Sequence, residues 1–204
     1  MAKETYHHGN LRAALLDAAE RLLGENGVTG VSLRAVAKEA GVSHTAPYRH
    51  FQDKQSLLAA LAEIGFARLR DAMYGVIDAY PEDPRRQLVE SAAAYVRLAT
   101  SSPEMNHLMF GGALPEDAAS SGTLQETAQQ AFQGLLDIIG NGIRAGLYVE
   151  RPPLELASTA WSLVHGLAML VSTGKLGRRG GENADPETLA RRMAEHLLEG
   201  ITAR

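Results

Sequence analysis

The sequence contains no cysteine among its 204 residues, and aromatic side chains make up only 5% of it. Without cysteine the chain has no disulfide framework, no cysteine-ligated zinc or iron–sulfur cluster and no thiol nucleophile, and it suits a reducing cytoplasm. A long apolar run is also missing. The stretch from Ala160 to Val171 is interrupted by Ser162 and His165 and is shorter than the roughly 20 residues that a membrane helix needs. We therefore expect a cytoplasmic protein that does not span a membrane.

Strict alternation of apolar and polar residues, which is typical of a half-buried strand, is absent as well. Apolar residues recur instead at spacings of three and four almost throughout, and this periodicity predicts an all-α fold. Capping residues, glycines and prolines set the expected boundaries. The predicted helices cover residues 10–26, 32–40, 43–51, 53–77, 84–101, 104–110, 120–146, 153–174 and 186–203, and residues 174–184 form a predicted loop.

Residues 33–52 have the pattern of a helix-turn-helix. Ala37 is small where two helices would cross, Gly41 supplies the turn, and Val42 and Phe51 close a small core. Short glycine-turn hairpins also occur in proteins that do not bind DNA. Here the second helix gathers hydrogen-bonding side chains that suit phosphates and base edges, which favours DNA binding. They are Ser43, His44, Thr45, Tyr48, Arg49 and His50.

The chain has no excess of positive charge: it has 20 Lys and Arg residues and 24 Asp and Glu residues, which give a formal net charge of -4. Such a balance opposes binding to nucleic acid, whose non-specific affinity comes from basic side chains. The charges are unevenly divided, however. Residues 1–55 carry seven basic against six acidic side chains and four of the seven histidines, whereas residues 56–204 carry thirteen basic against eighteen acidic ones. We expect these two segments to be separate domains, with the DNA-binding role in the first.

Four short motifs carry a resemblance to a known family: Tyr6-His7-His8-Gly9-Asn10-Leu11-Arg12-Ala13-Ala14-Leu15-Leu16, Ser32-Leu33-Arg34-Ala35-Val36-Ala37, Gly41-Val42-Ser43, and Ala46-Pro47-Tyr48-Arg49-His50-Phe51 with Lys54. Together they resemble the TetR family of transcriptional regulators, in its AcrR-like branch. The resemblance implies that the third helix enters the major groove and that a dimer binds a pseudo-palindromic operator. It also implies that a small ligand in the C-terminal domain releases the DNA.

The same resemblance implies roles for single residues. Arg34 resembles a base or phosphate contact at the start of the second helix. Ser43, His44 and Thr45 resemble base readers, and Tyr48, His50 and Lys54 resemble phosphate clamps. Pro47 departs from the family pattern, in which many members carry leucine. A proline there is expected to bias Ala46 away from the α conformation and to shift the start of the helix.

The segment Ala160-Trp161-Ser162-Leu163-Val164-His165-Gly166 resembles the Trp-His-Gly signature of one subgroup of the family's C-terminal domains. Trp161, His165 and Met169 follow at spacings of four, so they share one helix face. That stripe is either core or the wall of an apolar pocket with a few polar groups. The candidate ligand-binding residues are Tyr95, Met105, Asn106, Met109, Phe110, Phe132, Trp161, His165 and Met169.

A second face of the same helix carries small residues at a spacing of four, which lets another helix approach closely. The last predicted helix carries a matching apolar stripe. Two copies of the chain would join these faces in a four-helix seam across a twofold axis, although both stripes also suit an intramolecular core. The candidate interface residues are Ser158, Ser162, Gly166, Leu189, Met193, Leu197 and Ile201.

Two other classes of function are compatible with the sequence. One is a helical enzyme that uses His165 as a general base with Tyr95 or Asn106, and the other is a helical interaction module without an operator. His7 and His8 have no third ligand at metal-binding spacing, so we expect no metal and no cofactor. The favoured prediction is a ligand-responsive repressor, without catalytic residues, that binds double-stranded operator DNA as a homodimer. A small hydrophobic effector would release it.

Overall fold

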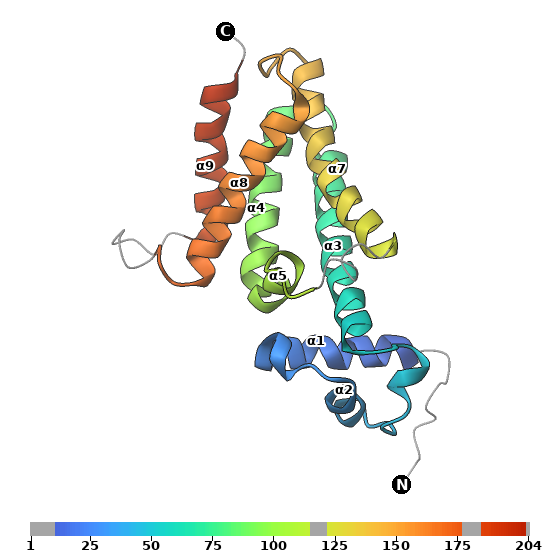
Figure 1. Cartoon of the computed structure of the whole chain (residues 1–204). Coiled ribbons are helices and arrows are strands. Elements are labelled where there is room, and N and C mark those ends of the chain that lie inside the picture. Colours follow the sequence, from blue (N-terminus) through green and yellow to red (C-terminus); the bar gives the residue numbers. More distant parts are fainter. Residues whose placement is uncertain (1–10, 115–121, 177–184, 203–204) are drawn as a thin grey trace. The chain divides into compact units, whose positions relative to one another are not determined.

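The computed structural model describes residues 11–114, 122–176 and 185–202, and these are almost entirely helical, as predicted (Figure 1). Contacts group the chain into two compact units. The N-terminal unit comprises residues 1–65 and 104–124, and the C-terminal unit comprises residues 66–103 and 125–204. The predicted loop from Gly177 and the His7-His8 pair lie outside the described residues.

The N-terminal unit is built from helices α1 (Leu11–Gly30), α2 (Leu33–Glu39), the short 3-10 helix η2 (Pro47–Arg49), the first part of α3 (Lys54–Ala79) and most of α5 (Pro103–Phe110). Its core is apolar and draws on nearly every element. The buried side chains include Leu15, Ala18, Leu23, Val31, Val36, Ala37, Phe51, Leu57, Leu61, Met105 and Leu108.

Polar caps determine where α2 and α3 begin. The Ala35 N–H donates to Ser32 Oγ over 3.1 Å, as expected for an N-cap serine. Before α3, the Ser56 N–H donates to Asp53 Oδ1 at 2.8 Å and the Asp53 N–H donates to Ser56 Oγ at 3.1 Å. This reciprocal pair satisfies two backbone donors at once. Gly41, with φ +67°, makes the turn that follows α2.

The predicted end of the first helix, just before Gly27, coincides with a kink in α1. Gly27 interrupts the helix with φ 64° and ψ -172°, but a further helical turn continues to Gly30. Glycine adopts this left-handed conformation without steric cost. It also leaves room for α5, because a Cβ atom at Gly27 would lie 3.0 Å from Glu104 Oε2.

The predicted α-helix over residues 43–51 is also corrected. The segment forms a turn followed by η2, in which the Ala46 N–H donates to the Ser43 carbonyl at 3.0 Å and the Arg49 N–H to the Ala46 carbonyl at 3.2 Å. Pro47 explains the change, because it has no N–H to donate to the Ser43 carbonyl as an α-helix requires. The expected bias on Ala46 is not observed, since Ala46 has φ -61° and ψ -43°.

The C-terminal unit contains the end of α3, α4 (Pro84–Ser101), most of α7 (Gly122–Arg144), α8 (Pro153–Ser172) and α9 (Pro186–Ile201). Helix α4 packs against both α8 and α9. Most of its side chains are buried, and alanines dominate its middle, Ala92, Ala93 and Ala94, which allows the close helix packing. Prolines in the first turn mark the starts of α4 and α9, as predicted, and aspartate side chains cap both helices.

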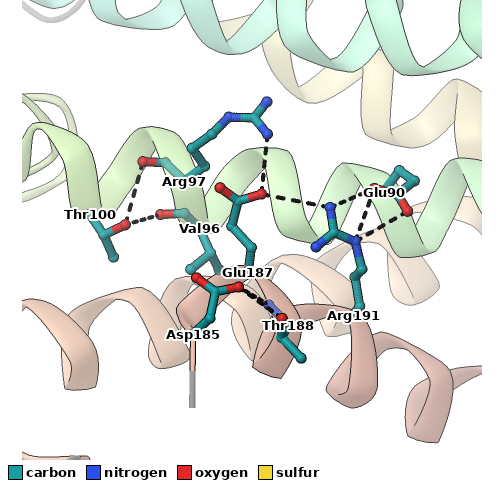
Figure 2. Close-up of polar contacts among 8 residues, drawn as sticks. All are labelled: Glu90, Val96, Arg97, Thr100, Asp185, Glu187, Thr188 and Arg191. Atoms are coloured by element: carbon teal, nitrogen blue, oxygen red, sulfur yellow. Dashed lines mark hydrogen bonds and ion pairs between the residues drawn. The ribbon is translucent and has the colours of Figure 1, made fainter. Parts of the chain in front are cut away.

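Ion pairs fasten α9 to α4 at the edge of this core (Figure 2). The Arg191 guanidinium donates through Nε and Nη2 to Glu90 Oε2, at 3.1 and 2.9 Å. Glu187 accepts from Arg97 Nη1 at 3.3 Å and lies 3.6 Å from Arg191 Nη2. The hydrogen bond to Glu90 raises the pKa of Arg191. The bidentate geometry fixes how α9 is rotated about its axis relative to α4. It adds little stability, because these side chains are partly exposed.

Candidate nucleic-acid interface and ligand pocket

The helix-turn-helix presents its polar side chains to solvent. Val42 is half-buried and Pro47 and Phe51 are buried, so these three anchor the segment to the core of the N-terminal unit. The residues between them point outward. The exposed candidates for DNA contact are Ser43, His44, Thr45, Tyr48, Arg49 and His50 on this segment and Arg34 on α2. Tyr48 is 61% exposed, which is unusual for a large aromatic side chain without a binding role.

Local hydrogen bonds order part of this surface. Ser43 Oγ and Thr45 Oγ1 lie 3.2 Å apart, so one hydroxyl orients the other. Arg12, which the sequence reasoning did not select, places its guanidinium 5.6 Å from the centroid of the Phe51 ring, next to His50 along the chain. Its position in the first turn of α1 makes Arg12 a further candidate, because helix N-termini and arginines are both common phosphate contacts.

Lys54 differs from the other candidates because it is half-buried. Its ammonium donates to the Val28 carbonyl at 2.7 Å and so joins the start of α3 to the end of α1. The carbonyl uses one of the three N–H donors of the ammonium. Lys54 therefore has a structural contact in addition to its predicted contact with phosphate.

The C-terminal unit contains a small, partly open apolar cavity of about 30 Å³. None of its lining residues is charged. They are Met73, Leu88, Ser91, Ala92, Tyr95, Leu135, Ala160, Trp161, Leu163, Val164, Ala194 and Leu197. Only Tyr95 and Trp161 come from the predicted ligand-binding set, and Leu197 comes from the predicted seam. The remaining lining residues, apart from Ser91, are ordinary apolar positions, which sequence periodicity assigns to a core but not to a particular cavity.

Four predicted ligand residues nevertheless form one aromatic cluster. Tyr95 Oη and His165 Nδ1 lie 2.7 Å apart, and the ring centroids of Trp161 and His165 lie 5.8 Å apart. Phe132 meets Trp161 edge to face at 6.1 Å. Burial raises the pKa of Tyr95 to about 12 and lowers the pKa of His165. Both groups are therefore neutral near pH 7, and the cluster offers hydrogen bonding without charge.

The other predicted ligand residues lie elsewhere. Met105, Asn106, Met109 and Phe110 belong to α5 in the N-terminal unit, where a Cβ atom on Gly65 of α3 would approach Met109 Sδ to 2.5 Å and Met105 Sδ to 3.1 Å. The two methionines thus pack directly onto the backbone of α3. Met169 is 38% exposed near the end of α8. Helix α5 is accordingly part of the N-terminal core rather than of the aromatic cluster.

The candidate seam residues differ in exposure. Ser162 is exposed, Ser158 and Gly166 are half-buried, and Ile201 is buried in the core of its own chain. Leu189, Met193 and Leu197 pack against that core and are only partly covered. Helix α8 also exposes Leu154, Met169 and Leu170, and only 33% of its most apolar stretch is buried. By length and composition alone α8 could cross a membrane, a test that core helices of soluble proteins also pass.

In the described part of the chain, no group of three or more metal-ligating side chains comes together.

Comparison with known sequences gives two matches that together span most of the chain. Residues 15–61 match the family described as bacterial regulatory proteins, tetR family. Residues 88–197, more than half of the chain, match the tetracyclin repressor-like C-terminal domain. The more detailed resemblance to the Trp-His-Gly subgroup stays a prediction.

Individual relatives agree with these matches. The HTH-type transcriptional regulator BetI of Rhizobium meliloti is 28% identical over 162 residues, which cover 78% of this chain and 73% of that protein. A solved structure of a protein of unknown function from Rhodococcus sp. RHA1 is 33% identical, with a TM-score of 0.86 over 98% of this chain and 100% of that one. The TetR family regulator PfmR from Thermus thermophilus is 19% identical and shares the fold, with a TM-score of 0.70 over 91% of this chain and 97% of that one.

The matched families consist of transcriptional regulators, so the alternative of a helical enzyme is set aside. An exposed helix-turn-helix segment and a C-terminal helical unit are the two parts that such a regulator requires. The chain belongs to the TetR family of DNA-binding transcriptional regulators.

Proposed function

We propose that this regulator is a cytoplasmic repressor that binds a pseudo-palindromic operator as a homodimer and leaves it when a small hydrophobic effector binds. The observation that carries the proposal is the run of exposed polar side chains from Ser43 to His50 on the family's helix-turn-helix. Base readout requires placed donors and acceptors rather than high net charge. The near-neutral N-terminal segment is consistent with such a reader.

The division of roles on this surface follows from position. Ser43, His44 and Thr45 form the turn that leads into η2, and we assign base contacts to them. Tyr48 and His50 flank the exposed side of η2, and we assign phosphate contacts to these two together with Arg34, Arg49 and Lys54. Phosphate contacts fix the register of the protein on the duplex and contribute equally to all sequences.

Substitutions test this division. We expect Tyr48→Phe to weaken binding to all duplexes by a similar factor, because it removes a phosphate contact and leaves base readout intact. Thr45→Val should instead change the ranking of matched and mismatched duplexes. Fluorescence anisotropy titrations at two salt concentrations measure both effects. A change in base ranking with Tyr48→Phe, or a uniform loss with Thr45→Val, would reverse the assignment.

The homodimer is supported by the exposed apolar side chains of α8, Leu154, Met169 and Leu170, and by the partly covered stripe of α9. Apolar surface of this kind on a soluble protein marks an interface. Sedimentation velocity of the full chain at micromolar concentration tests the proposal. We expect the mass of a dimer, and a monomer under these conditions would contradict it.

The apolar effector is supported by the lining of the C-terminal cavity, which has no charged side chain, and by the neutral Tyr95–His165 pair. A cavity of about 30 Å³ accommodates little more than one water molecule, so an effector must enlarge it. Two of its walls are Ala194 and Leu197 of α9, the helix that also carries the proposed seam. Enlargement would therefore displace part of the dimer interface. The effector would then bind the displaced state more tightly than the DNA-bound state, and release requires this difference in affinity.

A further inference from the structure

Arg12 is a basic side chain of the N-terminal unit to which the proposed function assigns no role. It is the second residue of α1, and its side chain is exposed. Among the residues that the structure describes, Arg12 makes no ion pair. Arg21, further along the same helix, is different because it pairs with Glu39 at 3.0 Å. The charge of Arg12 is therefore available to an anionic partner outside the chain.

The Phe51 ring holds the Arg12 guanidinium in place. The guanidinium carbon lies 5.6 Å from the ring centroid, which is the distance of a cation–π contact. Phe51 is itself fixed, because its side chain is buried and its N–H donates to the Pro47 carbonyl at 2.9 Å. A contact with a ring face uses none of the N–H donors of a guanidinium. The charge is thus held over a rigid surface while its hydrogen-bond donors stay available.

The contact with Phe51 also places Arg12 beside the proposed DNA-contact segment. The ring centroid of His50, an exposed residue to which we assign a phosphate contact, lies 6.5 Å from that of Phe51. Arg12 and His50 line one hollow in the surface of the N-terminal unit. The basic surface of the helix-turn-helix therefore continues onto the first turn of α1.

Two carboxylates, those of Asp53 and Glu63, line the same hollow. The Asp53 carboxylate accepts the Ser56 N–H at the start of α3, and in the described part of the chain neither carboxylate is ion-paired with Arg12. Their charges disfavour a free anion in the hollow. A phosphate of a DNA duplex is different, because the other contacts of the helix-turn-helix hold the duplex against this surface.

We propose that Arg12 contacts a phosphate of the DNA backbone and that Phe51 is the positioning residue that holds its guanidinium ready. A guanidinium suits this partner, because it donates two parallel hydrogen bonds to phosphate oxygens. A side chain that is ordered before binding also loses less entropy when the complex forms. The proposal rests on DNA binding by the helix-turn-helix, and it is independent of repression, of the dimer and of the apolar effector.

Salt dependence of DNA binding tests the role of Arg12. The probe is a short duplex of random sequence, because phosphate contacts contribute to binding of every sequence. Fluorescence anisotropy of the full chain at several salt concentrations gives the slope of log affinity against log salt. Arg12→Gln should reduce this slope by about one for each protomer on the duplex, and Arg12→Lys should retain most of it. Arg21→Gln, the same change on the opposite face of α1, should leave it unchanged.

A double-mutant comparison tests the positioning role of Phe51. Phe51→Leu keeps an apolar core side chain and should weaken duplex binding by about twofold to fivefold, the effect of one lost cation–π contact. The same substitution should have no effect in the Arg12→Gln background.

Two results would overturn the proposal alone: an unchanged salt slope in Arg12→Gln, or an equal loss from Phe51→Leu in both backgrounds. A native chain that binds no duplex at low salt would overturn the proposed function as well, so the two failures are distinguishable.

Discussion

The Lys54 ammonium donates to the Val28 carbonyl at 2.7 Å, although its place in the sequence motif indicates a phosphate contact. A half-buried ammonium can serve both purposes, because it has three N–H donors and the Val28 carbonyl uses one of them. Experiments can distinguish the two roles, since the hydrogen bond to Val28 affects the stability of the fold and the phosphate contact affects only DNA binding.

We predict that Lys54→Met lowers the free energy of unfolding by about 1–2 kcal/mol, because it removes a hydrogen bond from a charged donor and keeps the aliphatic stem. Lys38→Met, an exposed position on α2, should change stability by less than about 0.5 kcal/mol. Urea unfolding measures both variants. Equal stability of the two would remove the structural role of Lys54.

His165 makes the stability of the C-terminal unit depend on pH. Burial lowers its pKa in the folded protein, whereas histidine in the unfolded chain titrates near its ordinary value of about 6.5. As the pH falls through that value, the unfolded chain takes up the proton first, and the folded state loses stability. The stability that depends on neutral His165 is fully present above the pKa of histidine in the unfolded chain, and it is lost as the pH falls through the pKa of His165 in the folded protein.

We therefore predict that acidification from about pH 7.5 to about pH 5.5 destabilises the native protein more than the His165→Gln variant. Glutamine retains hydrogen bonding to Tyr95 but does not titrate. Urea unfolding at the two pH values gives the comparison. An identical loss in both proteins would show that His165 is not responsible.

At the scale of elements, most helices could be predicted because capping residues, prolines and turn glycines mark their ends in the local sequence. Ser32, Asp53, Asp83 and Asp185 cap helices through their own side chains, and Gly41 adopts the left-handed turn. The segment after Gly41 could not be predicted as well. There the helix-turn-helix pattern favoured an α-helix, while Pro47 removes a backbone donor and leaves a turn with a 3-10 helix.

The crossing of α5 over α3 is the element contact that a single substitution tests best. We predict that Gly65→Ala destabilises the protein by about 1–3 kcal/mol, because its Cβ would meet Met109 Sδ at 2.5 Å. Gly75→Ala on the same helix meets nothing within 4 Å and should stabilise the protein by about 0.5–1 kcal/mol through helix propensity.

Thermal and urea unfolding of both glycine variants provide the measurement. Adding Met109→Ala to Gly65→Ala should restore part of the lost stability, because it removes the atom that the new Cβ meets. If Gly65→Ala behaved like Gly75→Ala, the close packing of α5 on α3 would be contradicted.

At the scale of the whole molecule, sequence reasoning reached the family and the exposed reading segment but not the walls of the cavities. The DNA-contact candidates lie close together in sequence, between Arg34 and Lys54, so a local motif identifies them. A cavity is formed by residues from several helices, and nothing local distinguishes Leu135 or Ala194, which line the apolar cavity, from other core positions. The same reason explains why Met105 and Met109, chosen for the pocket by residue type, lie in the N-terminal core.

The central claim is that the chain reads a specific, twofold-symmetric DNA sequence through the segment from Ser43 to His50. Selection from random duplex DNA with the full chain, followed by sequencing of the retained pool, tests it most directly. We predict enrichment of one inverted repeat, and loss of that enrichment when His44 and Thr45 are both replaced by alanine. A pool that remains random at low salt, or that enriches a site without twofold symmetry, would contradict the account.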